Sequence, residues 1–420
     1  MTTPIKRRTL LAGGAATVGL TLPGVAAHAG GRPTTKVAFT LNAEVLDGGE
    51  QITSLTLHTA GIGRIDPASL TTDTFRVHAE ATSPIEIAAG DLIFSEYDLD
   101  RAVTGARLDR RGDIVLDLDH AEAQVGGGTL GYIVSRGRNV QLDLTYTITQ
   151  QSPLKLRNRR SVTITKFSQG ELSSPEVDAF AYGVSRSKMN YRLFRPEGSR
   201  RRGERPLIVW LHGGGEGGSL ADGYYDNESQ LRANRGALGF ATEEAQRIFG
   251  GAYVVAPQST SYWIEDGDRF APLIREIIND VTRKYAIDKD RIYVVGCSNG
   301  GYMTMKMTTL YKNFFAASVP ICGVVQPFGP NAERLITDAE LTSIRTPTWL
   351  VSSADDATVD PVANTELAHD LIPRSLLTMY DDVTWNGHRF AGHWSWIYVA
   401  RNDPSKRGTH IWQWMARQRS

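Results

Sequence analysis

A serine stands between two glycines directly after an apolar run. Residues 291–295 read Arg-Ile-Tyr-Val-Val, and Gly-Cys-Ser-Asn-Gly follows at 296–300. A G-x-S-x-G sequence between a buried strand and a helix forms a strained turn that presents the serine hydroxyl, and the helix start brings backbone N–H groups nearby. The pattern also arises by chance in long sequences, so the prediction depends on the apolar run before it and the helical stretch after it, 302–311. We therefore expect Ser298 to be a nucleophile.

A serine hydroxyl needs a base to take its proton, so an acid and a histidine are expected further along the chain, in that order. Three acids follow a later apolar run: Asp355, Asp356 and Asp360. We prefer Asp356, because it precedes Val359 by three residues, a spacing at which such a loop turns its carboxylate inward. Asp355 is the alternative. Asp360 is expected to cap the helix that begins at Pro361.

Two histidines near the C-terminus are candidates for the base. His388 and His393 are five residues apart, a spacing that suits no metal-binding pair on a helix. His393 lies between Gly392, which frees the loop, and the apolar residues 394–398, which would hold the imidazole in place. We therefore predict His393 as the base and His388 as a loop or pocket residue.

A glycine-rich loop could supply the site for a negatively charged oxygen. The apolar run 205–211 leads into His-Gly-Gly-Gly at 212–215. The N–H of Gly214 or Gly215, together with that of Asn299, is expected to bind the oxyanion of a tetrahedral intermediate. Glu216 is interpreted as a hydrogen-bonding residue that stabilises the loop.

The same glycines allow a second interpretation. Gly213, Gly215 and Gly218 match G-x-G-x-x-G, the pattern of a dinucleotide site. No convincing helix begins at Ser219, so we disfavour a nucleotide cofactor and expect none. Tyr262, Trp263 and Trp394 are candidate walls of an apolar substrate pocket, although each could also be an ordinary packing residue.

The strands and helices expected to position these residues form two parts of the chain with different sequence patterns. Residues 32–167 alternate apolar and polar positions in short runs separated by Gly, Asp and Pro, which predicts an antiparallel sandwich of the immunoglobulin type. A polar linker is expected over 168–178. Residues 179–420 alternate Val/Ile/Leu-rich runs with helical stretches, the best being Arg269–Tyr285. This alternation predicts a doubly wound, mainly parallel sheet with its site at the carboxyl ends of the strands.

Composition excludes several classes of function. Of 420 residues, 46 are Lys or Arg and 46 are Asp or Glu, so no strong field would attract nucleic acid or anionic lipid. Two cysteines cannot build a disulfide scaffold or a structural zinc cluster. No H-E-x-x-H or paired-cysteine motif suggests a metal-dependent reaction. We expect no metal, no nucleic acid and no cofactor.

The first 29 residues have the features of a secretory signal. Arg7 and Arg8 precede a moderately apolar stretch, and Ala27-His28-Ala29 resembles a cleavage site. The paired arginines resemble a twin-arginine export signal. A transmembrane helix is disfavoured, because the stretch is short and contains Gly and Pro23. We expect an exported chain beginning near Gly30, with 43 basic and 46 acidic residues and no membrane span.

At this point the motifs resemble a known family. They are Trp210 to Glu216, Ala256-Pro257-Gln258, Tyr262-Trp263, Asp288 to Met303, and Phe315 to Cys322. Together they are similar to secreted bacterial α/β-hydrolases often labelled predicted peptidases, which are related to polyester depolymerases and feruloyl esterases. With the preceding sandwich, the chain resembles the esterases that carry an N-terminal immunoglobulin-like domain.

The resemblance implies a serine esterase acting on small or polymeric carboxylic esters, with Ser298, Asp356 and His393 at the catalytic positions. It also implies a sandwich that lies against the catalytic domain and influences the active-site mouth or assembly. Cys297 departs from many relatives, which have another small or apolar residue there. Neighbouring strand ends could bring Cys297 and Cys322 within disulfide reach, or both could be buried free thiols.

Two other functions are weaker alternatives. Peptidases of the prolyl-oligopeptidase type usually carry a β-propeller of at least four blades of roughly forty residues each, which about 130 residues without a repeat cannot provide. A non-catalytic binding or adhesion protein is disfavoured by the intact set of nucleophile, acid, base and oxyanion loop.

Overall fold

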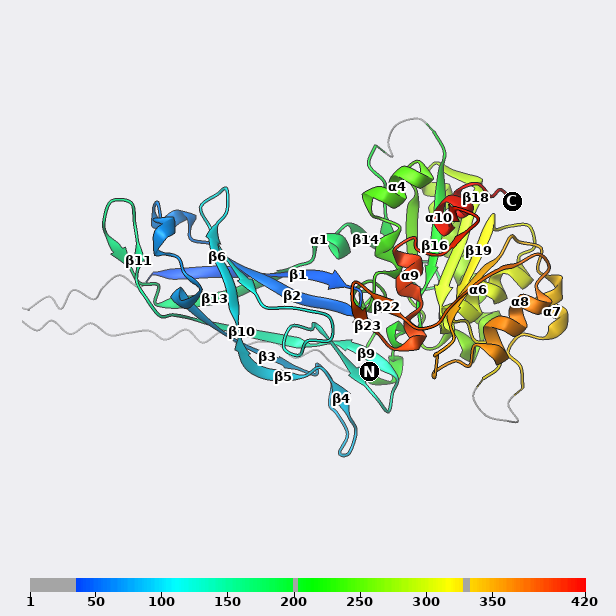
Figure 1. The fold of residues 1–420 in the computed structure, drawn as a ribbon, viewed down its shortest axis with the longest axis horizontal. Coiled ribbons are helices and arrows are strands. Elements are labelled where there is room, and N and C mark those ends of the chain that lie inside the picture. Colours follow the sequence, from blue (N-terminus) through cyan, green and yellow to red (C-terminus); the bar gives the residue numbers. More distant parts are fainter. Residues whose placement is uncertain (1–34, 199–202, 328–332) are drawn as a thin grey trace, which may run out of the picture. The chain divides into compact units, whose positions relative to one another are not determined.

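The structure is a computed structural model that describes residues 35–198, 203–327 and 333–420 (Figure 1). The predicted signal segment, 1–29, lies outside these residues. From Thr35 to Ser420 the chain forms one compact unit. Within the described ranges, no helix combines the length and the apolar character that crossing a membrane requires.

The N-terminal part is rich in β-strands, as predicted, and its immunoglobulin-like type stays a prediction. One sheet has five strands in the order β13-β1-β2-β7-β6, and another has three in the order β10-β3-β5. Their bounds are β1 (Lys36–Leu46), β2 (Gly49–Leu57), β3 (Phe75–Thr82), β5 (Tyr97–Arg101), β6 (Val103–Leu108), β7 (Ile114–Leu118), β10 (Asp143–Gln150) and β13 (Lys166–Ser173).

Alternating burial explains how this part holds together. Along β1, Val37, Phe39 and Leu41 are buried, while the residues between them are partly or fully exposed. Successive side chains of a strand point to opposite faces, so these apolar residues reach one core shared with β2, β3 and β7.

A third, smaller sheet has the order β4-β8-β9. Its strands are β4 (Ile93–Phe94), β8 (Leu130–Ile133) and β9 (Arg138–Gln141), and both pairs are antiparallel. The short hairpin of β11 (Leu154–Lys155) and β12 (Ser161–Val162) completes this part.

The segment expected to be a polar linker is ordered instead. Residues 168–173 belong to β13, which pairs with β1 in parallel and so extends the N-terminal sheet. Pro175–Asp178 then forms the short helix α1. The polar side chains misled the prediction because β13 has an exposed face, so its alternation is weak.

The C-terminal part contains an eight-stranded sheet in the order β14-β15-β17-β16-β18-β19-β20-β21. The pairs from β17 to β21 are parallel, as predicted, whereas β14-β15 and β15-β17 are antiparallel. The strands are β14 (Phe180–Val184), β15 (Asn190–Phe194), β16 (Arg205–Leu211), β17 (Tyr253–Pro257), β18 (Ile287–Cys297), β19 (Ala317–Ile321), β20 (Trp349–Ser353) and β21 (Leu376–Tyr380).

Helices cover both faces of this sheet. The main ones are α5 (Gly267–Lys284) and α6 (Asn299–Leu310), and the shorter ones are α2 (Ser229–Arg232), α3 (Gly236–Gly239), α4 (Glu243–Phe249), α7 (Asp338–Ser343), α8 (Leu367–Leu371), α9 (Trp396–Ala400) and α10 (Ile411–Ala416). The predicted helix over 269–285 corresponds to α5 within two residues.

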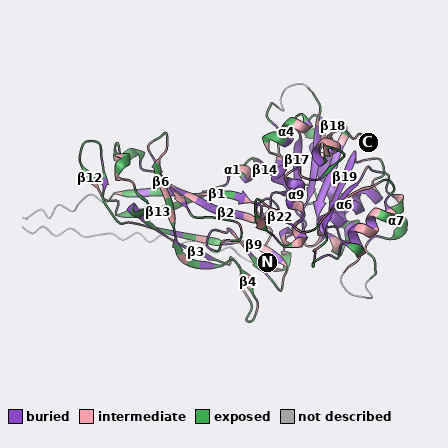
Figure 2. Ribbon diagram, viewed as in Figure 1, coloured by how far each residue is buried: buried purple, intermediate pink, exposed green. Residues whose placement is uncertain are grey.

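Central strand β16 shows why two helical layers form. Leu207 and Val209 pack in one core cluster with the apolar stripe of α5, whereas Ile208 and Trp210 pack in another with residues of α3, α4 and α10. The buried sheet lies between these layers in Figure 2. A parallel sheet covered on both sides needs strands that are apolar on both faces, which explains their continuous Val/Ile/Leu runs.

Buried ion pairs join the β-rich part to the C-terminal part. Glu50 of β2, whose side chain is fully buried, pairs with Arg232 of α2. Asp47 accepts two hydrogen bonds from Arg401, each of 2.9 Å. Val45 of β1 packs in the C-terminal core. These contacts explain why the residues from Thr35 onward form a single unit.

Candidate active site

Ser298 lies at the sharp turn between β18 and α6. Its backbone has φ 54° and ψ −115°, a strained conformation for a residue with a Cβ. The turn passes so close to the end of β16 that a Cβ on Gly300 would stand 1.9 Å from the carbonyl oxygen of Leu211. Only glycine fits there, which explains the pattern around the serine. The side chain of Ser298 is partly exposed and lines a cavity.

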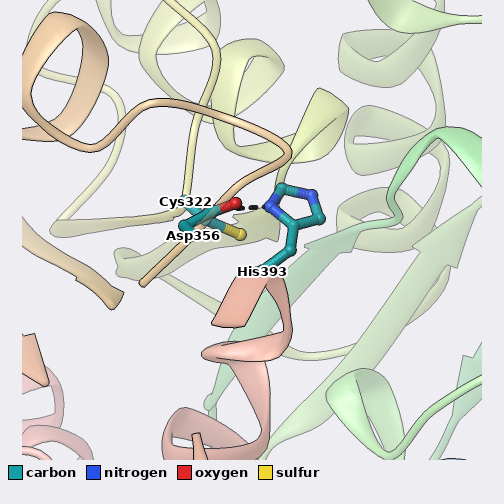
Figure 3. A group of neighbouring side chains, drawn as sticks. All are labelled: Cys322, Asp356 and His393. Atoms are coloured by element: carbon teal, nitrogen blue, oxygen red, sulfur yellow. Dashed lines mark hydrogen bonds and ion pairs between the residues drawn. The ribbon is translucent and has the colours of Figure 1, made fainter. Parts of the chain in front are cut away.

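His393 and Asp356 form a buried pair (Figure 3). The His393 Nδ1 lies 2.8 Å from the Asp356 Oδ2, and the other carboxylate oxygen accepts hydrogen bonds of 2.9 Å from the N–H groups of Thr358 and Val359. The acid is thus held by the loop that follows β20. The predicted spacing to Val359 corresponds to this hydrogen bond.

The competing residues have other partners. Asp355 accepts hydrogen bonds from the Ser353 hydroxyl at 2.5 Å and from Arg389 at 3.0 Å. His388 lies on the two-residue strand β23 (His388–Arg389), against the ring of Phe390. Neither residue is among those that line the cavity. Asp360 accepts a hydrogen bond from the Val362 N–H, the expected capping contact.

Cys322 also lies beside the pair. Ligand atoms of Cys322, Asp356 and His393 lie within 4.8 Å of one another. Burial of the ring lowers the pKa of His393, but the Cys322 sulfur and the Asp356 carboxylate raise it more, to about 10. These three residues could also hold a metal ion, although the ion would have to displace the proton shared by Asp356 and His393.

The glycine-rich loop lines the same cavity as Ser298. Gly214 begins a single 3-10 turn, Gly214–Glu216, directly after β16. A Cβ on Gly214 would lie 3.1 Å from the Tyr262 ring and 3.7 Å from the Asn299 Nδ2, so the loop passes close to the start of α6. Gly214, Gly215 and Asn299 line the same cavity of about 710 Å³ as Ser298 and His393. The three residues expected to supply oxyanion donors are therefore brought together at one cavity, and the direction of their N–H groups stays a prediction.

Glu216, which also lines the cavity, and the fully buried His212 stabilise the loop. Burial raises the pKa of Glu216 to about 7, and its Oε1 accepts a hydrogen bond of 3.4 Å from Asn139 of β9. The fully buried His212 accepts a hydrogen bond of 2.9 Å from the Ser259 N–H, and burial lowers its pKa to about 3. His212 is therefore neutral and structural.

Sequence reasoning missed the contribution of Arg138, a residue of β9. Its guanidinium donates hydrogen bonds to the carbonyl oxygens of Gly214 at 2.9 Å and Gly218 at 3.3 Å. It also stacks over the Tyr262 ring, 3.2 Å from the ring centre. Arg138 is buried, and this burial lowers its pKa. In the sequence it is one more polar residue in a short β-run, so no signal marked it.

One prediction about the site needs correction, and the structure decides between the two alternatives for the cysteines. Trp263 is fully buried, packs against Phe270 and donates a hydrogen bond of 3.1 Å to the His212 carbonyl, so it belongs to the core and not to the pocket wall. Tyr262 and Trp394 do line the cavity. Of the two alternatives for Cys297 and Cys322, a disulfide or buried free thiols, the structure has the buried free thiols.

The fold and part of the sequence are similar to known hydrolases. A model of the prolyl oligopeptidase family matches residues 274–331, the segment around Ser298. NocK of Nocardia uniformis subsp. tsuyamanensis, named as an esterase, is 28% identical over 148 residues, which are 33% of this chain and 41% of that protein. Poly(3-hydroxyalkanoate) depolymerase C of Paucimonas lemoignei is 29% identical over 147 residues. That match covers 32% of this chain and 31% of the depolymerase. The chain therefore spans less than half of either curated relative.

The structural similarity extends further along the chain. A thermostable esterase of known structure superposes with a TM-score of 0.69 at 22% identity, covering 91% of this chain and 99% of the esterase. This match confirms the predicted α/β-hydrolase fold. Together the comparisons support a hydrolase of this fold, and they include both esterases and a peptidase family.

Proposed function

We propose that this protein is a serine hydrolase that cleaves carboxylic esters through an acyl-enzyme. The observation that carries the proposal is that His393, which is hydrogen-bonded to Asp356, lines the same cavity as Ser298 on its strained turn. Nucleophile, base and orienting acid are the parts that such chemistry requires. The N–H groups of Gly214, Gly215 and Asn299 would complete the site.

In this mechanism the Ser298 oxygen attacks the ester carbonyl while the His393 Nε2 takes the hydroxyl proton. The N–H groups around Gly214 and Asn299 stabilise the negative oxygen of the tetrahedral intermediate. The proton on His393 then passes to the departing alcohol as the C–O bond breaks. Water then attacks the acyl carbon while His393 takes one of its protons, and as the bond between that carbon and the Ser298 oxygen breaks, His393 returns the proton to Ser298 and the carboxylic acid leaves.

Asp356 has two roles in this cycle. Its Oδ2 accepts the Nδ1 hydrogen of His393, which leaves Nε2 as the basic nitrogen. Its negative charge also stabilises the imidazolium formed when His393 takes the serine proton. The two loop N–H groups that bind the other oxygen keep the carboxylate in place.

Ester cleavage is favoured over peptide cleavage because both curated relatives are named for ester hydrolysis, one as an esterase and one as a polyester depolymerase. The prolyl oligopeptidase match favours a peptidase as the second candidate.

The test compares the rates at which the purified protein hydrolyses p-nitrophenyl butyrate and a panel of chromogenic peptides. Faster turnover of peptides than of the ester would select the second candidate, and no turnover of either would favour a binding protein.

Variants test the mechanism itself. We expect Ser298→Ala to lose ester hydrolysis by a factor of about 10⁴ or more, because the remaining groups cannot form the acyl-enzyme. Asp356→Asn and Asp355→Asn are a matched pair of adjacent changes. The first is expected to lower kcat by about 10³ to 10⁴, and the second by less than tenfold, since Asp355 is bound to Ser353 and Arg389. The opposite order would assign the acid to Asp355.

We also propose that the protein is exported, on the basis of residues 1–29 alone. The expected product in the culture medium or periplasm begins near Gly30, as mass spectrometry would show. Replacement of Arg7 and Arg8 by Lys is expected to block export by the twin-arginine route. Undiminished export of that variant would refute this route.

A further inference from the structure

One face of the β4–β8 pair is apolar but contributes nothing to the core. Phe94 and Tyr132 are cross-strand partners, and Leu92 is joined to Val134 by a backbone hydrogen bond of 2.9 Å. Because side chains alternate along a strand, these four residues share a face, while Ile93 and Ile133 point the other way into the core. We call these four residues the outer face.

The outer face is exposed to an unusual degree for such side chains. Leu92 is 60% exposed, Phe94 58%, Val134 42% and Tyr132 38%. An antiparallel pair with one buried face normally carries polar residues on the other, because they favour contact with water. Contiguous exposed apolar groups on a soluble protein mark a binding surface.

The outer face is continuous with the candidate active site. Phe94 and Tyr132 line the cavity that contains Ser298 and His393, and so does Val125, which is 68% exposed on a neighbouring loop. Other apolar residues of the lining lie on the C-terminal part: Ile264, Val324, Val359, Trp394 and Trp396. An apolar wall thus extends from the serine to the outer face.

We propose that the outer face, together with Val125, binds the apolar arm of an ester whose carbonyl lies at Ser298. The inference rests on the proposed function and names its substrate class, which is esters with a long aliphatic chain. A short ester reaches only the inner part of the cavity and gains nothing from Phe94 or Val125. A longer chain removes apolar surface from water on both sides, which stabilises its complex.

The test measures how kcat/KM depends on chain length. Two series are used: p-nitrophenyl esters from butyrate to dodecanoate, and butyrate esters of alcohols from ethanol to decanol. The variant Phe94→Ser/Val125→Ser removes the apolar groups at the outer end of the cavity. Leu310→Ser/Val362→Ser is the control, because these exposed residues are not among those that line it.

We compare kcat/KM for the longest ester of each series with kcat/KM for the shortest. In the Phe94/Val125 variant this ratio is expected to fall about tenfold in one of the two series, while hydrolysis of the shortest ester is unchanged. The control variant is expected to behave like the wild type. An unchanged ratio in both series would overturn the inference while leaving the proposed function intact. An equal loss on short and long esters would also overturn it, since it would indicate damage to the catalytic groups.

A second experiment tests whether the outer face instead binds another copy of this chain. Sedimentation of the wild type and of the Phe94/Val125 variant would detect self-association through the outer face. Dimers that only the wild type forms would replace the proposed substrate subsite with an interface. Monomers in both cases support the subsite. Failure of the wild type on every ester would instead refute the proposed function itself.

Discussion

Replacement of Arg138 by Ala tests whether the β-rich part takes part in catalysis. Arg138 comes from β9, yet its guanidinium binds the carbonyl oxygen of Gly214, a residue whose N–H we propose as an oxyanion donor. The change removes the 2.9 Å hydrogen bond to Gly214, the longer one to Gly218 and the stacking on Tyr262. We therefore expect a loop that still folds but is no longer held in one position.

The magnitude follows from these contacts. A hydrogen bond from a charged donor contributes about 1.5–3 kcal/mol, and a partly desolvated cation over an aromatic ring about 1–2 kcal/mol. Complete loss of one oxyanion donor costs about 10² to 10³ in kcat. Since Arg138 only orients such a donor, we expect Arg138→Ala to lower kcat by about 10 to 100 and to change KM little.

Steady-state hydrolysis of p-nitrophenyl butyrate gives kcat and KM separately. Thermal unfolding, followed by circular dichroism, identifies a temperature at which every variant is folded. Arg107→Ala is the control, because Arg107 lies in the same part of the chain and makes only an exposed ion pair with Asp117. Arg138→Lys should recover part of kcat. A folded Arg138→Ala protein with kcat within twofold of wild type would refute the positioning role.

Three further predictions concern other groups. The pKa of His393 is raised from 6.5 to about 10, and a base must be neutral to accept a proton, so kcat/KM should still rise above pH 7. Cys322→Ala removes one of the groups that raise this pKa and should shift the rise in kcat/KM to lower pH. A rise in kcat/KM that is complete below pH 6.5 would contradict this prediction. Glu50→Gln removes the more buried of the two carboxylates that pair with Arg232, the other being Glu228, and should lower the free energy of unfolding by about 2 kcal/mol in a denaturant titration, whereas a loss below about 1 kcal/mol would show that the pair is dispensable. A thiol probe should label Cys297 and Cys322 only after unfolding, without reductant, and a disulfide would prevent labelling.

Much of the C-terminal part could be predicted because its sequence is locally consistent. The strand before Ser298, the glycines that allow its turn and the helix after it each have their own pattern, and all three agree. The spacing of Asp356 and Val359 likewise reflects one hydrogen bond within a loop. Local signals of this kind can be recognised in a single sequence.

The missed features depend on contacts between distant residues. Arg138 acts through Gly214, and the burial of Trp263 depends on packing against α5, so neither role is visible in the residues next to them. Residues 168–173 of β13 were expected to belong to a linker. Their partner strand, β1, lies at the other end of the β-rich part, so the pairing is not visible in the neighbouring residues. Polar residues in an exposed strand resemble a loop until the partner strand is known.

The parallel pairing of β1 with β13 also bears on how the chain folds. Lys36 pairs with Lys166, so the first sheet cannot close until its last strand has emerged from the ribosome. The β-rich part also supplies Arg138 to the glycine loop and Glu50 to the buried pair with Arg232. A C-terminal fragment expressed alone would lack both contacts. The hydrogen bond from Arg138 to Gly214 spans 76 residues of the chain, so a long-range contact that the C-terminal part cannot supply by itself holds the glycine-rich loop.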